Sequence, residues 1–322
     1  MKSARLSVAM ATYNGAEFLS AQLASIAAQS RPPDELVVRD DGSTDATRRV
    51  IEAFAEAAPF RVELAVNARN LGSTATFERA VAACRGDVIA LADQDDVWRP
   101  GKLARLLDAL ERRPDAALVF SDADLVDAAQ RPLGPTLWER VLFTPRLQRR
   151  VARGEALEVL LRYPVVTGTT VAFRASLRER ALPIPPVWVH DGWLACVAAV
   201  QGGVVAVPDR LVLYRRHDRQ QIGAPRALWR EVVARARRER PAGRETPAQY
   251  TLLRERLTRD PPLAGADVLR RLDEKIAHLE ARAALPASLV RRIPVVAREL
   301  LRGRYARCSH GARSVANDLV FG

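Results

Sequence analysis

Cysteine and long apolar runs are scarce in this chain, and both absences narrow what it can be. The three cysteines, Cys84, Cys196 and Cys308, are odd in number and lack the spacing of a metal site. We therefore expect no disulfide framework, and we expect a protein of the reducing cytoplasm. No apolar stretch approaches the roughly 20 residues that a helix needs to cross a bilayer. The sequence passes from Met1-Lys2 straight into a strand-like run, so no signal peptide is expected.

The positive charge is unevenly distributed. Residues 226–322 contain 21 Lys and Arg against 11 Asp and Glu, a balance of +10 within the net charge of +12. A basic segment beside an almost neutral body says more about the partners of that segment than about chemistry. Anionic lipid and nucleic acid are the partners that such a segment attracts.

The first 121 residues alternate between strand-like and helix-like patterns. Strands are expected at 5–11, 35–39, 61–66, 88–92 and 117–121, with helical spacing between them, as at 16–29 and 102–113. Short connections between such elements predict βαβ units and a parallel sheet covered on both faces. Farther on, residues 165–173 read as one strand, in which Gly168 marks a close approach to the backbone.

Polar and acidic residues follow three of the expected strands. They are Thr12-Tyr13-Asn14, Asp40-Asp41 and Asp93-Gln94-Asp95-Asp96. Ligands bind at the carboxyl ends of strands in such sheets. Three carboxylates within four residues are costly to bury unpaired, and crowded oxygen ligands suit a hard divalent ion such as Mg2+ or Mn2+. The third stretch therefore predicts a metal-diphosphate site, and a solvated acidic turn is the alternative.

Six short motifs, spread over residues 5–223, occur in the order of a known family. They are Ala11-Thr12-Tyr13-Asn14-Gly15, Asp40-Asp41-Gly42-Ser43-Thr44-Asp45, Asn70-Leu71-Gly72, Asp93-Gln94-Asp95-Asp96-Val97-Trp98 with Lys102, His190-Asp191-Gly192-Trp193, and Tyr214-Arg215-Arg216-His217. With them the chain resembles the GT-A-fold glycosyltransferases of family 2, and within these the bacterial rhamnosyltransferase-like group. One departure is Asp218, where the family more often has a small residue and then Asn.

The resemblance implies an α/β fold of the GT-A (nucleotide-diphospho-sugar transferase) class, with a Rossmann-like, mostly parallel sheet. Residues 1–225 would form the catalytic domain, with the nucleotide sugar bound by 1–121 and the acceptor by 122–225, and residues 226–322 a basic helical extension. The implied reaction is inverting and metal-dependent. It would move a sugar, with rhamnose as the group-level expectation, from a dTDP or UDP donor to a glycan or lipid-linked acceptor in cell-surface polysaccharide synthesis.

The resemblance also assigns residues to the donor. Tyr13 would stack on a pyrimidine and Asp41 would accept a hydrogen bond from the ring N3-H, for which a carboxylate is a suitable acceptor. A half-buried turn aromatic and a helix cap are the alternatives for these two residues. Arg79 would help with the diphosphate, or be a surface arginine. The other expected contacts to the nucleotide sugar are Ala11, Thr12 and Gln94.

For the metal, Mg2+ or Mn2+, the resemblance implies Asp95 as a direct ligand. Asp93 would contact the ribose or the metal, and His217 would complete the metal shell, touch phosphate or be structural. The ion would offset the charge that grows on the leaving group. Asp191 is the expected general base, and His190 is either an alternative base or a neighbour.

Contacts to the sugar or acceptor are expected from aromatic and small residues. Trp98 and Trp193 would offer apolar platforms for sugar faces, with core packing as the alternative. Gly168 and Thr169 would line the acceptor side, where His190 is also expected.

The basic C-terminal segment carries an apolar helix face over 289–301 among arginines, as an interfacial helix does. We expect peripheral membrane contact through it. Packing on the catalytic domain or on a second subunit, giving a homodimer, is the alternative.

Two other functions compete with the transferase. A nucleic-acid-binding protein would fit the charge, but no aromatic interleaving or known module is present, so we expect no nucleic-acid partner. A non-catalytic nucleotide-sugar-binding module would have lost Asp95 or Asp191, and both are present.

Overall fold

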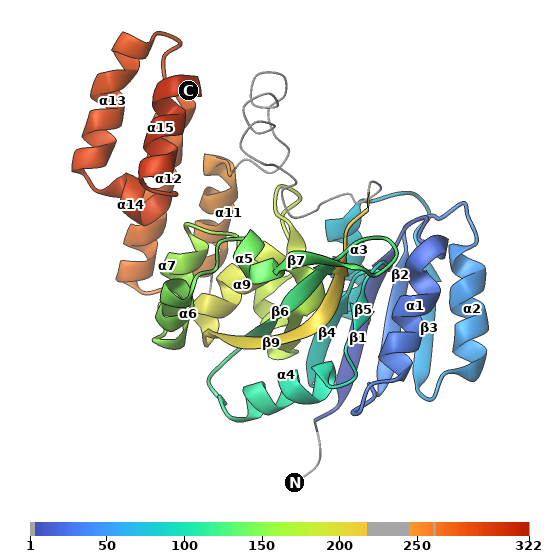
Figure 1. The fold of residues 1–322 in the computed structure, drawn as a ribbon. Helices are drawn as coiled ribbons and strands as arrows, with labels where there is room; N and C mark the ends of the chain where they lie inside the picture. The colour runs from blue at the N-terminus through green and yellow to red at the C-terminus, as the bar shows by residue number, and fades with distance from the viewer. Residues whose placement is uncertain (1–3, 218–244, 260–261, 322) are drawn as a thin grey trace. The chain divides into compact units, whose positions relative to one another are not determined.

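The computed structural model describes residues 4–217, 245–259 and 262–321 (Figure 1). The chain divides into two compact units. The first consists of Met1–Ala156 and Val165–Ile222, and the second of Leu157–Pro164 and Gly223–Gly322. Among the described residues, no helix combines the length and the apolar character that spanning a membrane requires.

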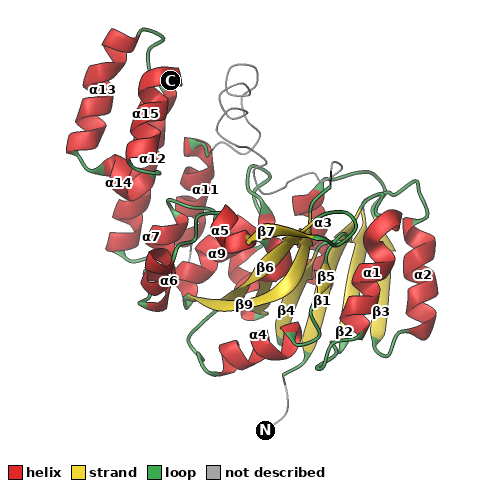
Figure 2. Ribbon diagram, viewed as in Figure 1, coloured by secondary structure: helices red, strands yellow, loops and turns green. Residues whose placement is uncertain are grey.

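The first unit is built on one nine-stranded sheet, flanked by helices (Figure 2). Its order is β3-β2-β1-β4-β8-β6-β9-β5, and β7 pairs with β6. The strands are β1 (Leu6–Thr12), β2 (Glu35–Asp40), β3 (Arg61–Val66), β4 (Val88–Ala92), β5 (Val97–Trp98), β6 (Leu118–Val126), β7 (Pro132–Thr136), β8 (Val171–Arg174) and β9 (Val204–Arg215). Strands β1 to β4 are mutually parallel where they pair, so their carboxyl ends share one edge.

Helices cover both faces of this sheet. In Figure 1, α1 and α2 lie in front of the parallel strands, whereas α3 lies behind them. The helices of this part are α1 (Ala16–Ala27), α2 (Thr47–Ala57), α3 (Ser73–Ala83), α4 (Lys102–Glu111), α5 (Leu137–Arg140), α6 (Pro145–Ala152), α8 (Ser176–Ala181) and α9 (His190–Gln201). Strands β1 and β4 are almost wholly buried between these layers, as the apolar run at 88–92 predicts for a central strand.

The predicted alternation of strand and helix is confirmed for the first four strands, and the prediction of one strand over 165–173 is wrong. Only β8 is extended, and Gly168–Thr170 forms a 3-10 turn. The turn arises because the N-H of Thr170 donates to the carbonyl of Thr167 at 2.9 Å. Strand β8 runs antiparallel to both neighbours, β4 and β6, a pairing that the alternation does not predict.

The second unit is helical. Its helices are α11 (Pro247–Thr258), α12 (Ala266–Ala283), α13 (Leu289–Leu301), α14 (Arg304–Cys308) and α15 (Ala312–Phe321), and α7 (Ala156–Leu160) crosses the boundary between the units in sequence. Its interior is unusually polar. The fully buried Lys275 donates to the carbonyls of Leu161 and Cys308 at 2.7 and 2.8 Å, and Arg282 forms a bidentate pair with the buried Asp318 at 2.6 and 2.8 Å.

Candidate functional site

The loops after β1 and β2 are joined by side-chain hydrogen bonds at the carboxyl edge of the sheet. The buried carboxylate of Asp40 accepts from the hydroxyl of Thr12 at 2.9 Å and from the hydroxyl and N-H of Ser43 at 2.5 and 2.8 Å. The hydroxyl of Ser43 in turn accepts from the N-H of Asn14, whose side-chain oxygen accepts from the N-H of Thr44, both at 2.9 Å. The two strand ends therefore form one preorganised structure.

Gln94 joins the loop after β4 to the loop after β1. Its side chain accepts from the N-H of Tyr13 at 2.9 Å and donates to the carbonyl of Tyr13 at 3.0 Å. A Cβ at Gly15 would lie 2.2 Å from the Gln94 Oε1, so a larger residue there would displace the Gln94 side chain from its bonds to Tyr13. The Tyr13 side chain is 38% exposed, which leaves its ring accessible to a ligand.

Asp41 holds the loop that precedes α3. Its carboxylate, in a residue only 3% exposed, accepts from the side chain of Asn67 at 2.8 Å and from the N-H groups of Leu71 and Gly72 at 2.8 and 2.9 Å. A carboxylate offers about four acceptor positions, so three are occupied and one is left for a base N-H. Arg79 donates to the Asn67 side-chain oxygen at 2.9 Å, which places it behind Asn67 rather than beside Asp41.

Asp95 and His217 are brought together from residues far apart in the sequence. The His217 Nε2 lies 2.8 Å from the Asp95 Oδ2, and both side chains are mostly buried. The imidazole packs against Phe18 of α1, with ring centroids 4.7 Å apart. Arg215 donates from its Nε to the Asp95 carbonyl at 2.7 Å and fixes the backbone of the acidic turn. The structure thus places a carboxylate and an imidazole so that one ion can bind both.

The donor set at this point suits a divalent cation only in part. Within the described portion of the chain, no three His, Cys, Asp or Glu side chains are arranged to enclose a metal ion. Two protein ligands are nevertheless what Mg2+ and ions of similar preference commonly use, because water and substrate phosphate fill the other positions. Asp95 and His217 are a pair of that kind.

Two further carboxylates lie beside Asp95. Burial, followed by repulsion from Asp95 and Asp191, raises the pKa of Asp93 to about 7. Burial and the charges of Asp95 and Asp93 also raise the pKa of Asp96 well above its usual range. The Asp96 Oδ1 accepts from the N-H of Arg215 at 2.9 Å, whereas its Oδ2 has no hydrogen-bond partner within the described residues. The edge thus holds three carboxyl groups close together, and burial and mutual repulsion favour the protonated forms of Asp93 and Asp96.

Lys102 supplies a positive charge from beneath this cluster. Its side chain is fully buried, and its Nζ donates to the carbonyl of Thr169 at 2.7 Å and lies 3.2 Å from the centroid of the Trp98 ring. Burial lowers the pKa of Lys102 well below its usual range, against the opposing influence of Asp96 and Asp93. When protonated, the lysine offsets part of the negative charge of Asp96 and Asp93.

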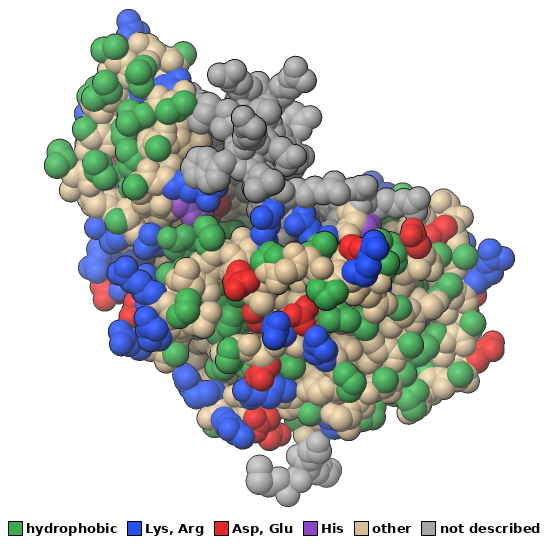
Figure 3. Space-filling model, viewed as in Figure 1, with side chains coloured by type: hydrophobic (Ala, Val, Ile, Leu, Met, Phe, Trp, Pro, Cys, Tyr) green, Lys and Arg blue, Asp and Glu red, His purple; other side chains and the backbone are tan. Residues whose placement is uncertain are grey.

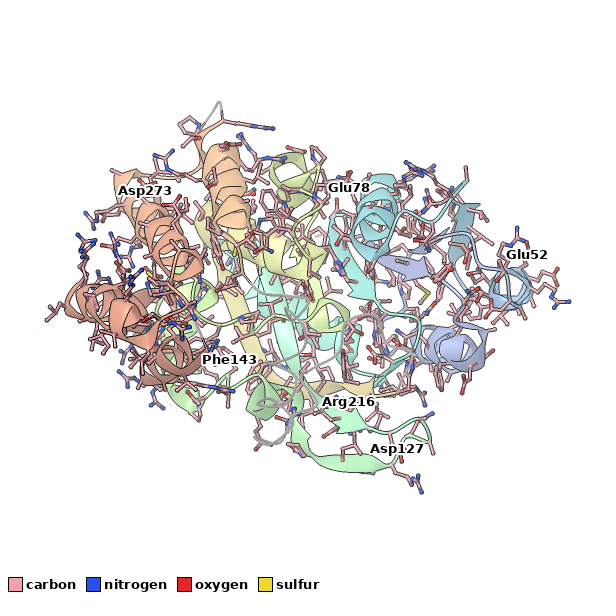
Figure 4. All side chains as sticks on the ribbon, turned by 90° about the horizontal axis from the view of Figure 1, so that it is seen from above. Glu52, Glu78, Asp127, Phe143, Arg216 and Asp273 are labelled. Atoms are coloured by element: carbon pink, nitrogen blue, oxygen red, sulfur yellow. The ribbon has the colours of Figure 1, made fainter. Side chains whose placement is uncertain are left out.

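Asp191 and His190 begin α9 on the other side of this edge. Figure 4 shows the side chains from above and labels two reference positions, Glu78 of α3 and Arg216 just after β9. The Asp191 Oδ2 accepts from the N-H of Gly168 at 2.9 Å, and its Oδ1 accepts from the N-H of Gly192 at 2.6 Å. These two bonds fix the orientation of the carboxylate.

His190 is oriented by packing instead. Its ring stacks on Phe77 of α3 with centroids 4.0 Å apart, and neither ring nitrogen has a hydrogen-bond partner among the described residues. Burial lowers its pKa, although the charge of Asp191 opposes this. A Cβ at Gly168 would lie 2.9 Å from the His190 Nε2, so the close approach predicted at this glycine is found. The neutral, buried imidazole is placed less well than Asp191 to accept a proton from a ligand.

The two tryptophans expected to face sugars lie in the core. Trp98 is 2% exposed and lies under Lys102, and Trp193 is fully buried, with its Nε1 donating to the carbonyl of Ala181 at 2.7 Å. Thr169 is also fully buried. Burial of this kind favours packing over direct contact with a sugar, because the surrounding side chains already occupy the ring faces.

Three residues without a predicted role help to build the site. Asn67 links Asp41 to Arg79, Arg215 holds the acidic turn, and Phe18 supports His217. Asn67 was detectable, because it is the first residue after β3 and so occupies a fourth strand end. Arg215 falls within the motif Tyr214-Arg215-Arg216-His217, which gave it no role, and no local pattern identifies Phe18, since its partner is distant in sequence.

Comparisons with known proteins identify the family of the chain. The family model for glycosyl transferase family 2 matches residues 7–178, just over half of the chain. An uncharacterized glycosyltransferase of Nostoc sp. (strain PCC 7120) is 30% identical over 256 residues, which are 76% of this chain and 74% of that protein. The dTDP-rhamnosyl transferase RfbG of Shigella flexneri is 24% identical over 221 residues, 67% of this chain and 74% of that protein.

A solved structure extends the match to the fold. The mannosyltransferase PcManGT of Pyrobaculum calidifontis, in complex with GDP-Man and Mn2+, aligns with 100% of this chain and 85% of its own, with a TM-score of 0.56 and 20% identity. This likeness confirms the predicted GT-A fold. Together with the family match, it shows that the chain belongs to glycosyl transferase family 2 and is a glycosyltransferase that uses a nucleotide-sugar donor.

Proposed function

We propose that this enzyme transfers a sugar, with inversion, from a dTDP- or UDP-linked donor to a glycan or lipid-linked acceptor of cell-surface polysaccharide. The observation that carries the proposal is the convergence at one sheet edge of the Asp95–His217 pair and the oriented carboxylate of Asp191. The charge of Asp191 contributes to the raised pKa of Asp93, so the proposed base and the acidic turn lie near each other. Rhamnose is the first sugar to test, because a relative is named for dTDP-rhamnosyl transfer.

The donor nucleotide would bind between the loops after β1 and β2. The exposed ring of Tyr13 offers a face for a pyrimidine, and the remaining acceptor position of Asp41 suits the ring N3-H. The backbone at Ala11 and Thr12 and the Gln94 bridge would set the depth of the pocket. Because hydrogen bonds already join these loops, binding would require little reordering.

Asp95 and His217 would hold the divalent cation together with the diphosphate. The Mn2+ bound by the structurally similar mannosyltransferase supports a metal of this type, Mg2+ or Mn2+. A cation in this position supplies Lewis-acid stabilisation of the charge on the leaving diphosphate. Arg215 and Phe18 keep the two ligands in place, and Asp93, when ionised, adds negative charge or contacts the ribose.

Asp191 would act as the general base. An acceptor hydroxyl attacks the anomeric carbon as its bond to the diphosphate oxygen breaks, and the hydroxyl proton passes to the Asp191 carboxylate. Each oxygen of that carboxylate keeps a lone pair beyond its bond to Gly168 or Gly192. We further propose that residues 1–225 perform this chemistry in the cytoplasm and that 226–322 form an extension that does not bind the donor.

Calorimetric titration of UDP, dTDP and GDP, with and without Mn2+, tests the donor site directly. We expect metal-dependent binding of a pyrimidine nucleotide to the wild type and its loss in Asp95→Ala. The matched control is Asp108→Ala, which removes an exposed carboxylate on α4 that pairs with Arg105 and Arg112. If none of the three nucleotides binds under either condition, the proposed donor site is wrong.

A further inference from the structure

Helix α13 buries two charged residues along with Val296 and exposes most of its large apolar side chains. Arg292 and Glu299 are only 8% and 2% exposed, whereas large apolar side chains of the same helix are 52–90% exposed. The exposed set is Leu289, Val290, Ile293, Leu300 and Leu301. Their spacing of three, four and seven residues places them in one stripe, which we call the α13 apolar stripe. A helix that only packs on its own domain shows the opposite arrangement.

Hydrogen bonds fix this orientation. Arg292 donates to the carbonyls of Pro286, Ala287 and Leu319 at 2.6, 2.8 and 3.3 Å. Glu299 accepts from Arg304 at 3.0 Å and lies 2.9 Å from the Nδ1 of the fully buried His278. Rotating the helix to bury its apolar stripe would break these buried contacts, which costs more than exposing a few aliphatic side chains. The stripe is therefore directed outward by the rest of the unit.

The charges around the stripe have one sign. Residues 288–322 contain seven arginines and only two acidic residues, Glu299 and Asp318. Both acids are buried and hydrogen-bonded to basic residues within the unit. Arg291, Arg298 and Arg302 are exposed and follow one another at helical spacing along one side of the stripe. No exposed carboxylate from this segment offsets them, and of the three only Arg302 also lies near the buried Glu299, at 3.7 Å.

Helix α15 packs on the inner side of α13 and adds one exposed apolar residue to this unit. The carbonyl of Leu319 accepts from Arg292 of α13, and the next residue, Val320, is 64% exposed. Figure 3 shows apolar side chains gathered on the lobe where Figure 1 places α13 and α15. A surface with an apolar centre and a row of arginines is larger and more one-sided than scattered surface leucines would be.

We propose that the α13 apolar stripe and its row of arginines form a docking surface for an anionic lipid bilayer. The aliphatic side chains would enter the boundary between headgroups and acyl chains, and Arg291, Arg298 and Arg302 would face the lipid phosphates. Complementary charge selects this occupant over a second copy of the chain, because two such faces would bring their arginines together. The surface is independent of the donor site, so it does not depend on the proposed donor or base.

Co-sedimentation of the full-length protein with vesicles tests the proposal. We expect binding to vesicles of phosphatidylcholine with about 30% phosphatidylglycerol and much weaker binding to phosphatidylcholine alone, since an anionic surface attracts juxtaposed arginines. Val290→Gln/Ile293→Gln/Leu301→Gln should weaken binding at least about tenfold without changing net charge, because three side chains lose their burial among lipids. Leu133→Gln, at a site 46% exposed on β7, is the matched control and should bind like the wild type.

A second variant separates the charge from the apolar contact. Arg291→Gln/Arg298→Gln should weaken binding to the anionic vesicles about tenfold or more and make it less sensitive to salt. Wild-type protein that stays in the supernatant with both vesicle types overturns the proposal, as does undiminished binding of the triple variant. A dimer by light scattering that the triple variant converts to a monomer would assign the surface to a second copy instead. Circular dichroism of each variant verifies folding.

Discussion

Replacing Asp191 with Asn removes the proposed proton acceptor while preserving the size of the side chain. Both carboxylate oxygens are held by backbone N-H groups, of Gly168 at 2.9 Å and of Gly192 at 2.6 Å. General-base assistance typically contributes about 10²–10⁴-fold, equivalent to about 3–5 kcal/mol of activation free energy. We therefore expect kcat of Asp191→Asn to fall by that factor.

The same substitution should also lower stability and leave donor binding intact. The amide NH2 of Asn must face one of the two backbone N-H groups, and both are donors. A backbone N-H left without an acceptor in this way lowers the free energy of unfolding by about 1–3 kcal/mol. The negative charge of Asp191 contributes to the raised pKa of Asp93. Removing that charge makes the site less repulsive to a diphosphate, so the dissociation constant of the nucleotide should not increase.

The assay is release of nucleoside diphosphate at saturating donor and Mn2+, combined with calorimetry of nucleotide binding. Asp209→Asn is the control, because it makes the same change at a carboxylate 46% exposed that pairs with Arg105 at 2.8 Å. A variant with impaired turnover and normal nucleotide affinity supports the assignment. Wild-type turnover in Asp191→Asn would refute Asp191 as the base, and a parallel loss of nucleotide affinity would make it a binding residue instead.

Other residues give independent predictions. Gly168→Ala should lower the free energy of unfolding by about 1–3 kcal/mol in urea titrations, because its Cβ would lie 2.9 Å from the His190 Nε2. Gly265→Ala, which meets nothing within 4 Å, should be nearly neutral. Lys102→Met should destabilise by at least about 2 kcal/mol in the same titrations, because it strands buried carboxylates and a carbonyl. Burial lowers the pKa of His278, so the unfolded state binds its proton first as the pH falls. Wild-type stability should therefore fall below pH about 6.5, and His278→Gln should show a shallower fall in unfolding midpoints measured from pH 8 to 5.

The parallel half of the sheet was predictable because local patterns define it. The run from Val88 to Ala92 is apolar throughout and ends in carboxylates, and β4 occupies those same residues. The bounds of β3 were equally predictable, because its sequence alternates between polar and apolar side chains. Strand β8 was not, since nothing in its own sequence indicates that it enters the sheet antiparallel between β4 and β6. That pairing depends on contacts across the whole unit.

The candidate site, too, was predictable only in part. Family motifs suggested that Asp95 and His217 could share a metal, and the fold places them 2.8 Å apart. The motifs could not show that Asp41 is engaged by three donors of one loop, because Asn67 lies outside the recognised patterns. Periodicity likewise found the apolar face of α13 but not its direction, because the same spacing serves a buried face and an exposed one.

The paired hydrogen bonds between Gln94 and the backbone of Tyr13 couple two halves of the donor site mechanically. Tyr13 lies where the pyrimidine of the donor is proposed to bind, and Gln94 immediately precedes Asp95, the proposed metal ligand. A displacement of Tyr13 must either break these bonds or shift Gln94 and with it the acidic turn. If the nucleotide and the cation bind as proposed, occupancy at one end would change the free energy of binding at the other, and such coupling is reciprocal. A nucleoside without phosphates should then already bias the geometry that receives the cation.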